Sequence, residues 1–169
     1  MTPRDHNAAT AASAPATPAV KPPSQIQLDW QGEHRFDYGR PGKPTARADA
    51  SGATGPGPLN TLLGALAACA SVDVIDILEK RRTPAKRLSV IATGDRAQST
   101  PAKFVRVLLE YTIEGDSIDR AHAERAVDLS LSKYCSVRAT LDPALPVSFS
   151  VKLNGETGPV RVAGVVASP

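Results

Sequence analysis

The chain has 169 residues, enough for one domain with its own hydrophobic core and too few for two such domains. Hydrophobic residues make up 41% and charged residues 22%, the ordinary balance of a soluble protein. The net charge is only +3, and the basic residues are spread along the chain instead of being gathered as in nucleic-acid-binding proteins. We therefore expect no nucleic-acid partner.

Residues 1–24 are rich in Ala, Pro and Thr, and they cannot bury enough apolar area to offset about 1–2 kcal/mol of backbone ordering per residue. We predict a disordered extension over 1–24, one folded domain over 25–155 and a C-terminal tail over 156–169. The first thirty residues contain no apolar segment typical of a secretory signal, which indicates a cytoplasmic protein.

Alternating apolar and polar residues predict three strands before the first helix. Ile26, Leu28 and Trp30 alternate with polar residues, the pattern of a strand with one buried face. A second strand follows a turn and covers about 34–38, and a weaker third strand covers about 45–49.

A long apolar helix is predicted over 59–81, after a loop rich in Gly and Pro that ends at Pro58. Between 62 and 72 its residues are apolar or small on every side, so we expect it to be buried all round. Asp73 and Asp76 would be costly in lipid, so we expect a core helix and no membrane partner. A domain of this size hardly surrounds such a helix alone, which suggests cover from a partner subunit.

Two strands follow the long helix, over about 88–93 and 105–113. A second helix then starts near Asp116 or Ser117, either of which is a good N-cap, and it ends at Cys135. Its predicted buried stripe has helical spacing and consists of Ala123, Ala126, Val127, Ser130, Leu131 and Tyr134.

A last strand is predicted over 147–153, and residues 160–166 are a candidate for one more edge strand. The element order is therefore βββαββαβ. Strands and helices are segregated along the chain, which favours the α+β class over a doubly wound α/β sheet.

Any redox chemistry of this chain depends on its two cysteines, Cys69 and Cys135. In a reducing compartment they are free thiols, ligands or redox centres, and a thiol within an apolar helix also packs as a small hydrophobe. The three histidines, His6, His34 and His122, show no metal-ligand spacing with them, and nucleotide-binding motifs are missing. We expect neither a metal nor a cofactor.

The segments around both cysteines resemble the OsmC/Ohr family of osmotically inducible and organic hydroperoxide resistance proteins. One is GPLNTLLGALAACASVDV over 57–74, and the other is AVDLSLSKYCSV over 126–137. They occur in the family's order and approximate separation, and the resemblance covers about 25–153. It implies an OsmC-like fold in which two sheets surround the central helices of an intertwined homodimer.

The resemblance also implies a thiol-dependent peroxidase. Cys69 would attack an organic hydroperoxide and become a sulfenic acid, and Cys135 would resolve it to a disulfide that an external thiol or dithiol reduces. In the family an Arg from the N-terminal strands lies against the reactive thiolate. Arg35, Arg40 and Arg47 are the candidates here, and we select Arg35.

Two departures from the family pattern leave an alternative open. Family peroxidases carry a Glu just after the Pro that opens the central helix, whereas Leu59 and Asn60 follow Pro58 here. Asp73 lies one helical turn after Cys69, where its charge would raise the pKa of the thiol. The alternative is a non-enzymatic dimer of the same fold that binds a small apolar ligand or senses oxidants. The two cysteines favour the peroxidase, and the missing Glu favours the alternative.

Overall fold

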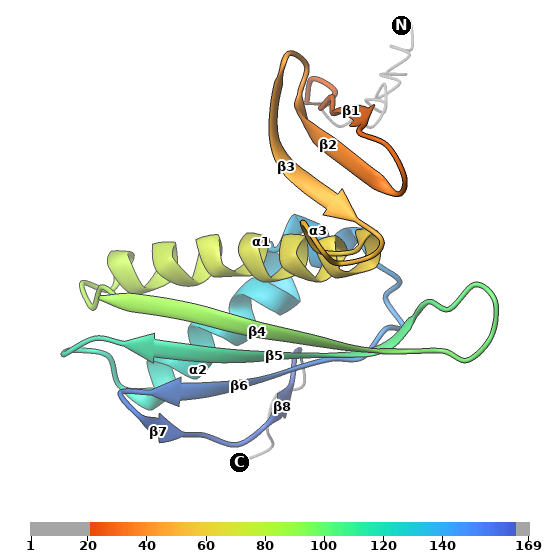
Figure 1. Cartoon of the computed structure of the whole chain (residues 1–169). Helices are drawn as coiled ribbons and strands as arrows, with labels where there is room; N and C mark the ends of the chain where they lie inside the picture. The colour runs from red at the N-terminus through yellow and green to blue at the C-terminus, as the bar shows by residue number, and fades with distance from the viewer. Residues whose placement is uncertain (1–20, 165–169) are drawn as a thin grey trace, which may run out of the picture.

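The computed structural model describes residues 21–164, in which a long helix packs on one sheet and a second sheet stands beyond the N-terminal end of that helix (Figure 1). The elements are β1 (Gln27–Trp30), β2 (Arg35–Arg40), β3 (Lys43–Asp49), α1 (Pro58–Lys80), β4 (Arg87–Arg96), β5 (Phe104–Glu114), α2 (Arg120–Leu129), the π-helical segment η1 (Ser130–Tyr134), α3 (Ser136–Thr140), β6 (Val147–Leu153), β7 (Glu156–Thr157) and β8 (Arg161–Val162). This succession confirms the predicted α+β class and the βββαββαβ order. The extension predicted over 1–24 lies mostly outside the described residues.

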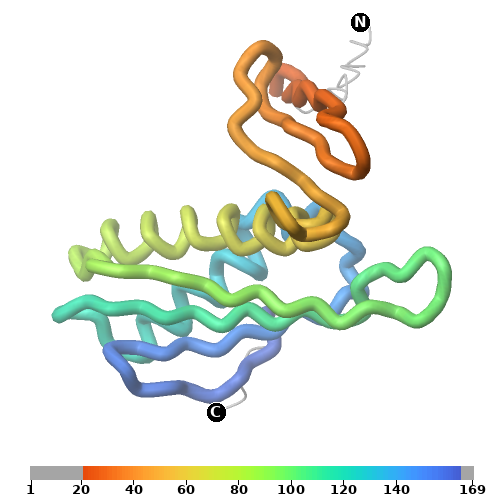
Figure 2. The backbone as a smooth tube through the Cα atoms, in the orientation of Figure 1, coloured from red at the N-terminus to blue at the C-terminus, as the bar shows by residue number. Residues whose placement is uncertain are grey.

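The first three strands form a separate antiparallel sheet in the order β1-β2-β3. The backbone trace shows this sheet projecting away from the rest of the chain, beyond α1 (Figure 2). Ile26, Leu28 and Trp30, predicted to face inward, are exposed, Trp30 by 67%. The prediction of a buried face is wrong for the single chain because no other element within residues 21–164 covers these side chains.

The second sheet has the order β4-β5-β6-β7, with β8 also paired to β6. β4 and β5 are antiparallel, whereas β5 and β6 run parallel because the chain crosses over through α2 between them. Residues 156–162, which the sequence assigned to the tail, supply the two short strands β7 and β8 at this edge. Strand β8 falls within the predicted edge segment 160–166.

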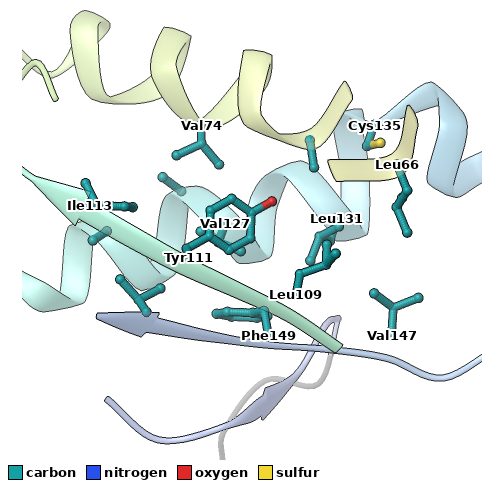
Figure 3. Close-up of a cluster of buried hydrophobic side chains, with 14 of the residues drawn as sticks. Leu66, Val74, Leu109, Tyr111, Ile113, Val127, Leu131, Cys135, Val147 and Phe149 are labelled. Atoms are coloured by element: carbon teal, nitrogen blue, oxygen red, sulfur yellow. The ribbon is translucent and has the colours of Figure 1, made fainter. Parts of the chain in front are cut away.

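The hydrophobic core lies between this sheet and the helices α1 and α2 (Figure 3). The sheet contributes Val107, Leu109, Tyr111 and Ile113 from β5 and Val147, Phe149, Val151 and Leu153 from β6. These residues confirm the predicted inner faces of both strands. Val105, predicted to join the same face of β5, is instead exposed, because it has no partner on β4 at a β-bulge-like shift in register, and Phe104 packs against the core in its place.

Helix α1 begins at Pro58, whose fixed φ suits the first helical position, and ends at Lys80. Its buried side chains recur every three or four residues and are Leu63, Leu66, Ala70, Val74 and Leu78. On the opposite side Val72 is 60% exposed and Ile75 is exposed as well. The single chain therefore covers only one face of α1, as expected for a domain too small to surround the helix alone, and burial of the other face by a partner subunit stays a prediction. Among the described residues only α1 is long and apolar enough to cross a membrane, as core helices of soluble proteins can be.

The second helix starts later than predicted. Its N-cap is Asp119, whose carboxylate accepts a hydrogen bond from the backbone N–H of His122 at 2.8 Å. Asp116 and Ser117 belong to the preceding turn, where Asp116 pairs with Lys86 at 2.5 Å. After Leu129 the helix widens into the π-helical segment η1, which changes the direction of its last side chains.

Tyr134 shows the effect of this widening. It was predicted to continue the buried stripe of the second helix, but it is 48% exposed. The stripe was extended at the spacing of an α-helix, and the wider turn of η1 breaks that spacing. The other five members of the stripe are all buried, as predicted.

Candidate active site

Cys69 lies in the middle of α1, half-buried, and packs against the edge of the core. Cys135 lies directly after η1 and is only 3% exposed. The backbone of Cys135 has left the helix, and its N–H donates to the carbonyl of Ser130 at 2.8 Å. Its sulfur then caps α3 by accepting the N–H of Arg138 at 3.4 Å.

The fold places these two thiols side by side, although they are 66 residues apart in the sequence. Burial raises the pKa of Cys135 to about 11, and the neighbouring Cys69 thiol adds to the rise through hydrogen bonding and charge. The backbone N–H groups of Arg138 and Val137 favour the thiolate and oppose this rise. At neutral pH Cys135 is therefore a protonated thiol held next to Cys69.

Polar groups near the thiols join α1 to the second helix. The hydroxyl of Ser130 lies 2.9 Å from a carboxylate oxygen of Asp73 and 3.0 Å from the carbonyl oxygen of Ala70. Asp73 is on the Cys69 face of α1, as the sequence predicted, but its carboxylate is engaged by this hydroxyl. Neither the hydrogen bonds of Ser130 to α1 nor the π-helical segment before Cys135 was predicted. A π-helical turn has no clear sequence signature, and the Ser130 contacts depend on how the two helices pack.

Tyr111 of β5 extends into the same region, and its hydroxyl points from the sheet toward the helices (Figure 3). Burial raises the pKa of Tyr111, and the charges of Cys135 and Asp73 raise it further, while the nearby Ser71 hydroxyl lowers it. The geometry of a hydrogen bond to Ser71 is not met, so the buried Tyr111 hydroxyl has no partner among the described residues. Alternation predicted that Tyr111 is buried, but not its place beside the thiols.

Two of the three candidate arginines, Arg35 and Arg47, are held by carboxylates of the N-terminal strands and their turns. Arg35 lies 3.5 Å from Glu33, and Arg47 donates two hydrogen bonds to Asp37 at 2.6 and 2.9 Å. Within the described part of the chain, no Lys or Arg side chain is among the groups that shift the pKa of Cys135. A contact between Arg35 and the thiols stays a prediction. The first turn of α1 contains no acidic residue, in keeping with Leu59 after Pro58.

A cavity of about 430 Å³ adjoins Cys135, between η1, α3 and β8. Cys135, Lys133 and Arg138 are among its lining residues, and Cys69 is not. This cavity was not predictable from the sequence, because α3, η1 and β8 meet only in the folded chain. Across residues 21–164, His, Cys, Asp and Glu side chains form no group of three or more that could hold a metal ion.

Comparison with known proteins agrees with this fold. The sequence model described as OsmC-like protein matches residues 50–150. Protein YhfA of Escherichia coli strain K12 is 34% identical over 103 residues, which make up 61% of this chain and 77% of YhfA. The chain belongs to the OsmC-like protein family.

Solved structures share the fold at lower sequence identity. The crystal structure of an OsmC-like protein from Mycoplasma pneumoniae matches with a TM-score of 0.68 at 21% identity, covering 79% of this chain and 99% of that one. An organic hydroperoxide resistance protein from Legionella pneumophila matches with a TM-score of 0.56 at 12% identity, covering 78% of this chain and 98% of that one. At these identities the likeness concerns the fold alone.

Proposed function

We propose that the protein is a thiol-dependent peroxidase that reduces organic hydroperoxides. The observation that carries the proposal is the position of Cys69 and Cys135, which come from distant segments and lie side by side. A half-buried thiol beside a buried one is the arrangement needed for oxidation followed by disulfide formation. The name of the Legionella protein of similar fold supports the substrate class, whereas the name of YhfA specifies no reaction.

The burial of the two thiols supports the roles that we propose for them. Cys69 is half-buried and open to a peroxide, whereas Cys135 is almost completely buried and its pKa is raised to about 11. The thiolate is the nucleophile toward peroxides, so the protonated and enclosed Cys135 is unsuited to the first attack. Cys69 is therefore the peroxidatic residue and Cys135 the resolving residue, as the family resemblance implied.

The reaction has three balanced steps. The Cys69 thiolate attacks one oxygen of the hydroperoxide, which breaks the O–O bond and leaves a sulfenic acid and an alcohol. Cys135 then attacks the Cys69 sulfur, forms the disulfide and releases the sulfenic oxygen as water. Two equivalents of an external thiol, or one dithiol, supply two electrons and restore both cysteines.

We propose that the working form is an intertwined homodimer. The exposed apolar residues Ile26, Leu28 and Trp30 on the first sheet, and Val72 and Ile75 on α1, are surface that a soluble monomer rarely leaves uncovered. β4 also has one unpaired edge among the described strands, which a second chain can approach. A cytoplasmic location fits free thiols, which persist in a reducing compartment.

A second candidate function is oxidant sensing by the same dimer without efficient turnover. The observation that favours it is the lack of a cation side chain among the groups that act on Cys135, together with the non-acidic first turn of α1. A sensor needs only one oxidation of the thiol pair, whereas a catalyst needs repeated turnover, so the sensor does not require the Glu and Arg of the family peroxidases. The same non-enzymatic dimer could instead bind a small apolar ligand, which is the other part of this alternative.

A turnover assay separates these functions. Protein, tert-butyl hydroperoxide and dithiothreitol are mixed, and hydroperoxide loss is followed over many equivalents of protein. The peroxidase consumes the hydroperoxide repeatedly and Cys69→Ser abolishes consumption. Cys135→Ser forms no Cys69–Cys135 disulfide and consumes hydroperoxide more slowly, because its sulfenic acid depends on direct attack by dithiothreitol. Disulfide formation without repeated consumption would establish the sensor, and no change at either cysteine would leave the ligand-binding function.

A further inference from the structure

The cavity beside Cys135 is not used by the peroxide step. Its volume of about 430 Å³ is within the range of small-molecule sites, and it is lined by apolar residues such as Leu145 and Val162 together with Lys133 and Arg138. It adjoins Cys135 from the side of η1, α3 and β8, whereas Cys69 is on α1 and outside the lining. The two sulfurs of the proposed disulfide therefore face different surroundings.

The charged side chains that line the cavity are all positive. Lys133 and Arg138 are its charged lining residues, no carboxylate belongs to the lining, and neither cation forms an ion pair within the described part of the chain. Arg138 is held in place because its guanidinium donates to the carbonyls of Asp142, Pro143 and Leu145 at 3.2–3.4 Å. Such a cavity favours an anionic ligand with a short apolar stem.

The chemistry of disulfide exchange selects the same sulfur. A thiolate that attacks a disulfide expels the other sulfur, and the sulfur of lower pKa leaves faster. Attack on Cys69 would expel Cys135, whose burial makes it a poor leaving group. Attack on Cys135 would expel Cys69, which is half-buried and better solvated.

We propose that this cavity is the entry site of the reducing thiol, that it prefers a small thiol carrying a carboxylate, and that this thiol attacks Cys135. The inference rests on the proposed function, since it concerns the reduction of the Cys69–Cys135 disulfide. The incoming thiolate forms a bond to the Cys135 sulfur, the Cys69–Cys135 bond breaks, and its electron pair leaves on Cys69. A second thiolate then attacks the sulfur of the bound thiol, releases the oxidised small-molecule disulfide, and leaves Cys135 to take up a proton.

The test uses the full chain with its disulfide formed by diamide, so that it does not depend on reaction with peroxide. The disulfide is reduced with 3-mercaptopropionate, 2-mercaptoethanol or cysteamine, and each rate is corrected for the thiolate fraction of the reagent. We expect 3-mercaptopropionate to react about fivefold faster than cysteamine, the effect of one partly exposed charge pair. Lys133→Gln should slow 3-mercaptopropionate about threefold and leave 2-mercaptoethanol unchanged. Lys80→Gln, a matched change at the far end of α1, should alter no rate.

The attacked sulfur is identified in the same samples. Early acid quenching, alkylation and peptide mapping should find the reagent on Cys135 and the alkyl group on Cys69. The reverse distribution, or equal corrected rates for the three reagents, would overturn the inference, and so would a failure of diamide to form the disulfide. If diamide forms the disulfide but peroxide does not, the proposed peroxidase function is wrong. The reduction rates of the diamide-formed disulfide still test the entry site.

Discussion

Cys135 depends on its surroundings for its chemical state. Its sulfur accepts one backbone N–H from Arg138, a contact that favours the thiolate, yet burial outweighs it and raises the pKa to about 11. The resolving thiol is therefore stored in its protonated form, safe from direct oxidation, until a sulfenic acid forms next to it.

This pKa makes the stability of the reduced protein depend on pH. The folded-state pKa of Cys135, about 11, lies above its ordinary value of 9.0, so folding favours the protonated thiol. The stabilisation is complete below about pH 9 and is lost as the pH rises toward 11. Urea unfolding of the reduced protein should therefore show a steeper loss of unfolding free energy from pH 9 to 11 than Cys135→Ser shows. Parallel curves for the two proteins would contradict the raised pKa.

Tyr111 provides a second test at the level of one residue. Its hydroxyl is buried without a hydrogen-bond partner among the described residues, which costs free energy on folding. Tyr111→Phe removes the hydroxyl and keeps the ring, so we expect the unfolding free energy to stay the same or rise by up to about 1 kcal/mol. Urea unfolding measures it. A decrease of more than about 1 kcal/mol would show that Tyr111 and Ser71 form a real hydrogen bond.

The two cysteines of the site were predictable, because each lies in a recognisable helical segment. Their neighbours were not. Ser130 appeared in the sequence only as a member of the buried stripe, and its link to α1 depends on how two helices pack. The cavity likewise needs α3 and β8, two short elements that carry no strong signal. The contact proposed for Arg35 requires the assembled protein and stays a prediction.

At the level of elements, the second helix shows which features hydrophobic spacing does not predict. The helical spacing located its core residues, but it did not predict the N-cap at Asp119 or the π-helical segment η1. Several neighbouring residues can serve as an N-cap, so the sequence alone does not select one. Asp116 and Ser117 have side chains suited to an N-cap, but they belong to the turn after β5, and Asp119 caps the helix instead. By contrast, the long strands and α1 have patterns strong enough to be located within a few residues.

The contact between η1 and α1 holds the two cysteine-bearing helices together. Ser130 is fully buried, and its hydroxyl bridges the carbonyl of Ala70 and the carboxylate of Asp73. Ser130→Ala removes this hydroxyl, whose single hydrogen is shared between the two acceptors, so we expect a loss of about 1–3 kcal/mol in unfolding free energy. Urea unfolding measures the loss.

Ser132→Ala is the matched control for this change. Its hydroxyl bonds only to the carbonyl of Asp128 in the preceding turn and is exposed, so the expected change is within about 0.5 kcal/mol. Equal effects of Ser130→Ala and Ser132→Ala would show that the link between the helices contributes nothing to stability.

At the scale of the whole molecule, a single chain buries one face of α1 and leaves the opposite apolar face exposed. Light scattering at micromolar concentration should find a dimer, and Val72→Asp should shift it toward monomer because the charge falls on the exposed apolar face of α1. Val160→Asp, a matched change at an exposed valine near β8, should leave the dimer intact. Trp30 is the only tryptophan and reports the same equilibrium through its fluorescence. A folded wild-type monomer at that concentration would contradict the dimer.

The pairing of Cys69 with Cys135 is the central claim, and one measurement tests it most directly. The reduced protein is treated with one equivalent of tert-butyl hydroperoxide, free thiols are counted, and the oxidised residues are located by peptide mapping. We predict that both thiols of each chain are lost together and that one disulfide joins Cys69 to Cys135 within the same chain. Loss of a single thiol with Cys135 unchanged, or disulfides only between chains, would contradict the account.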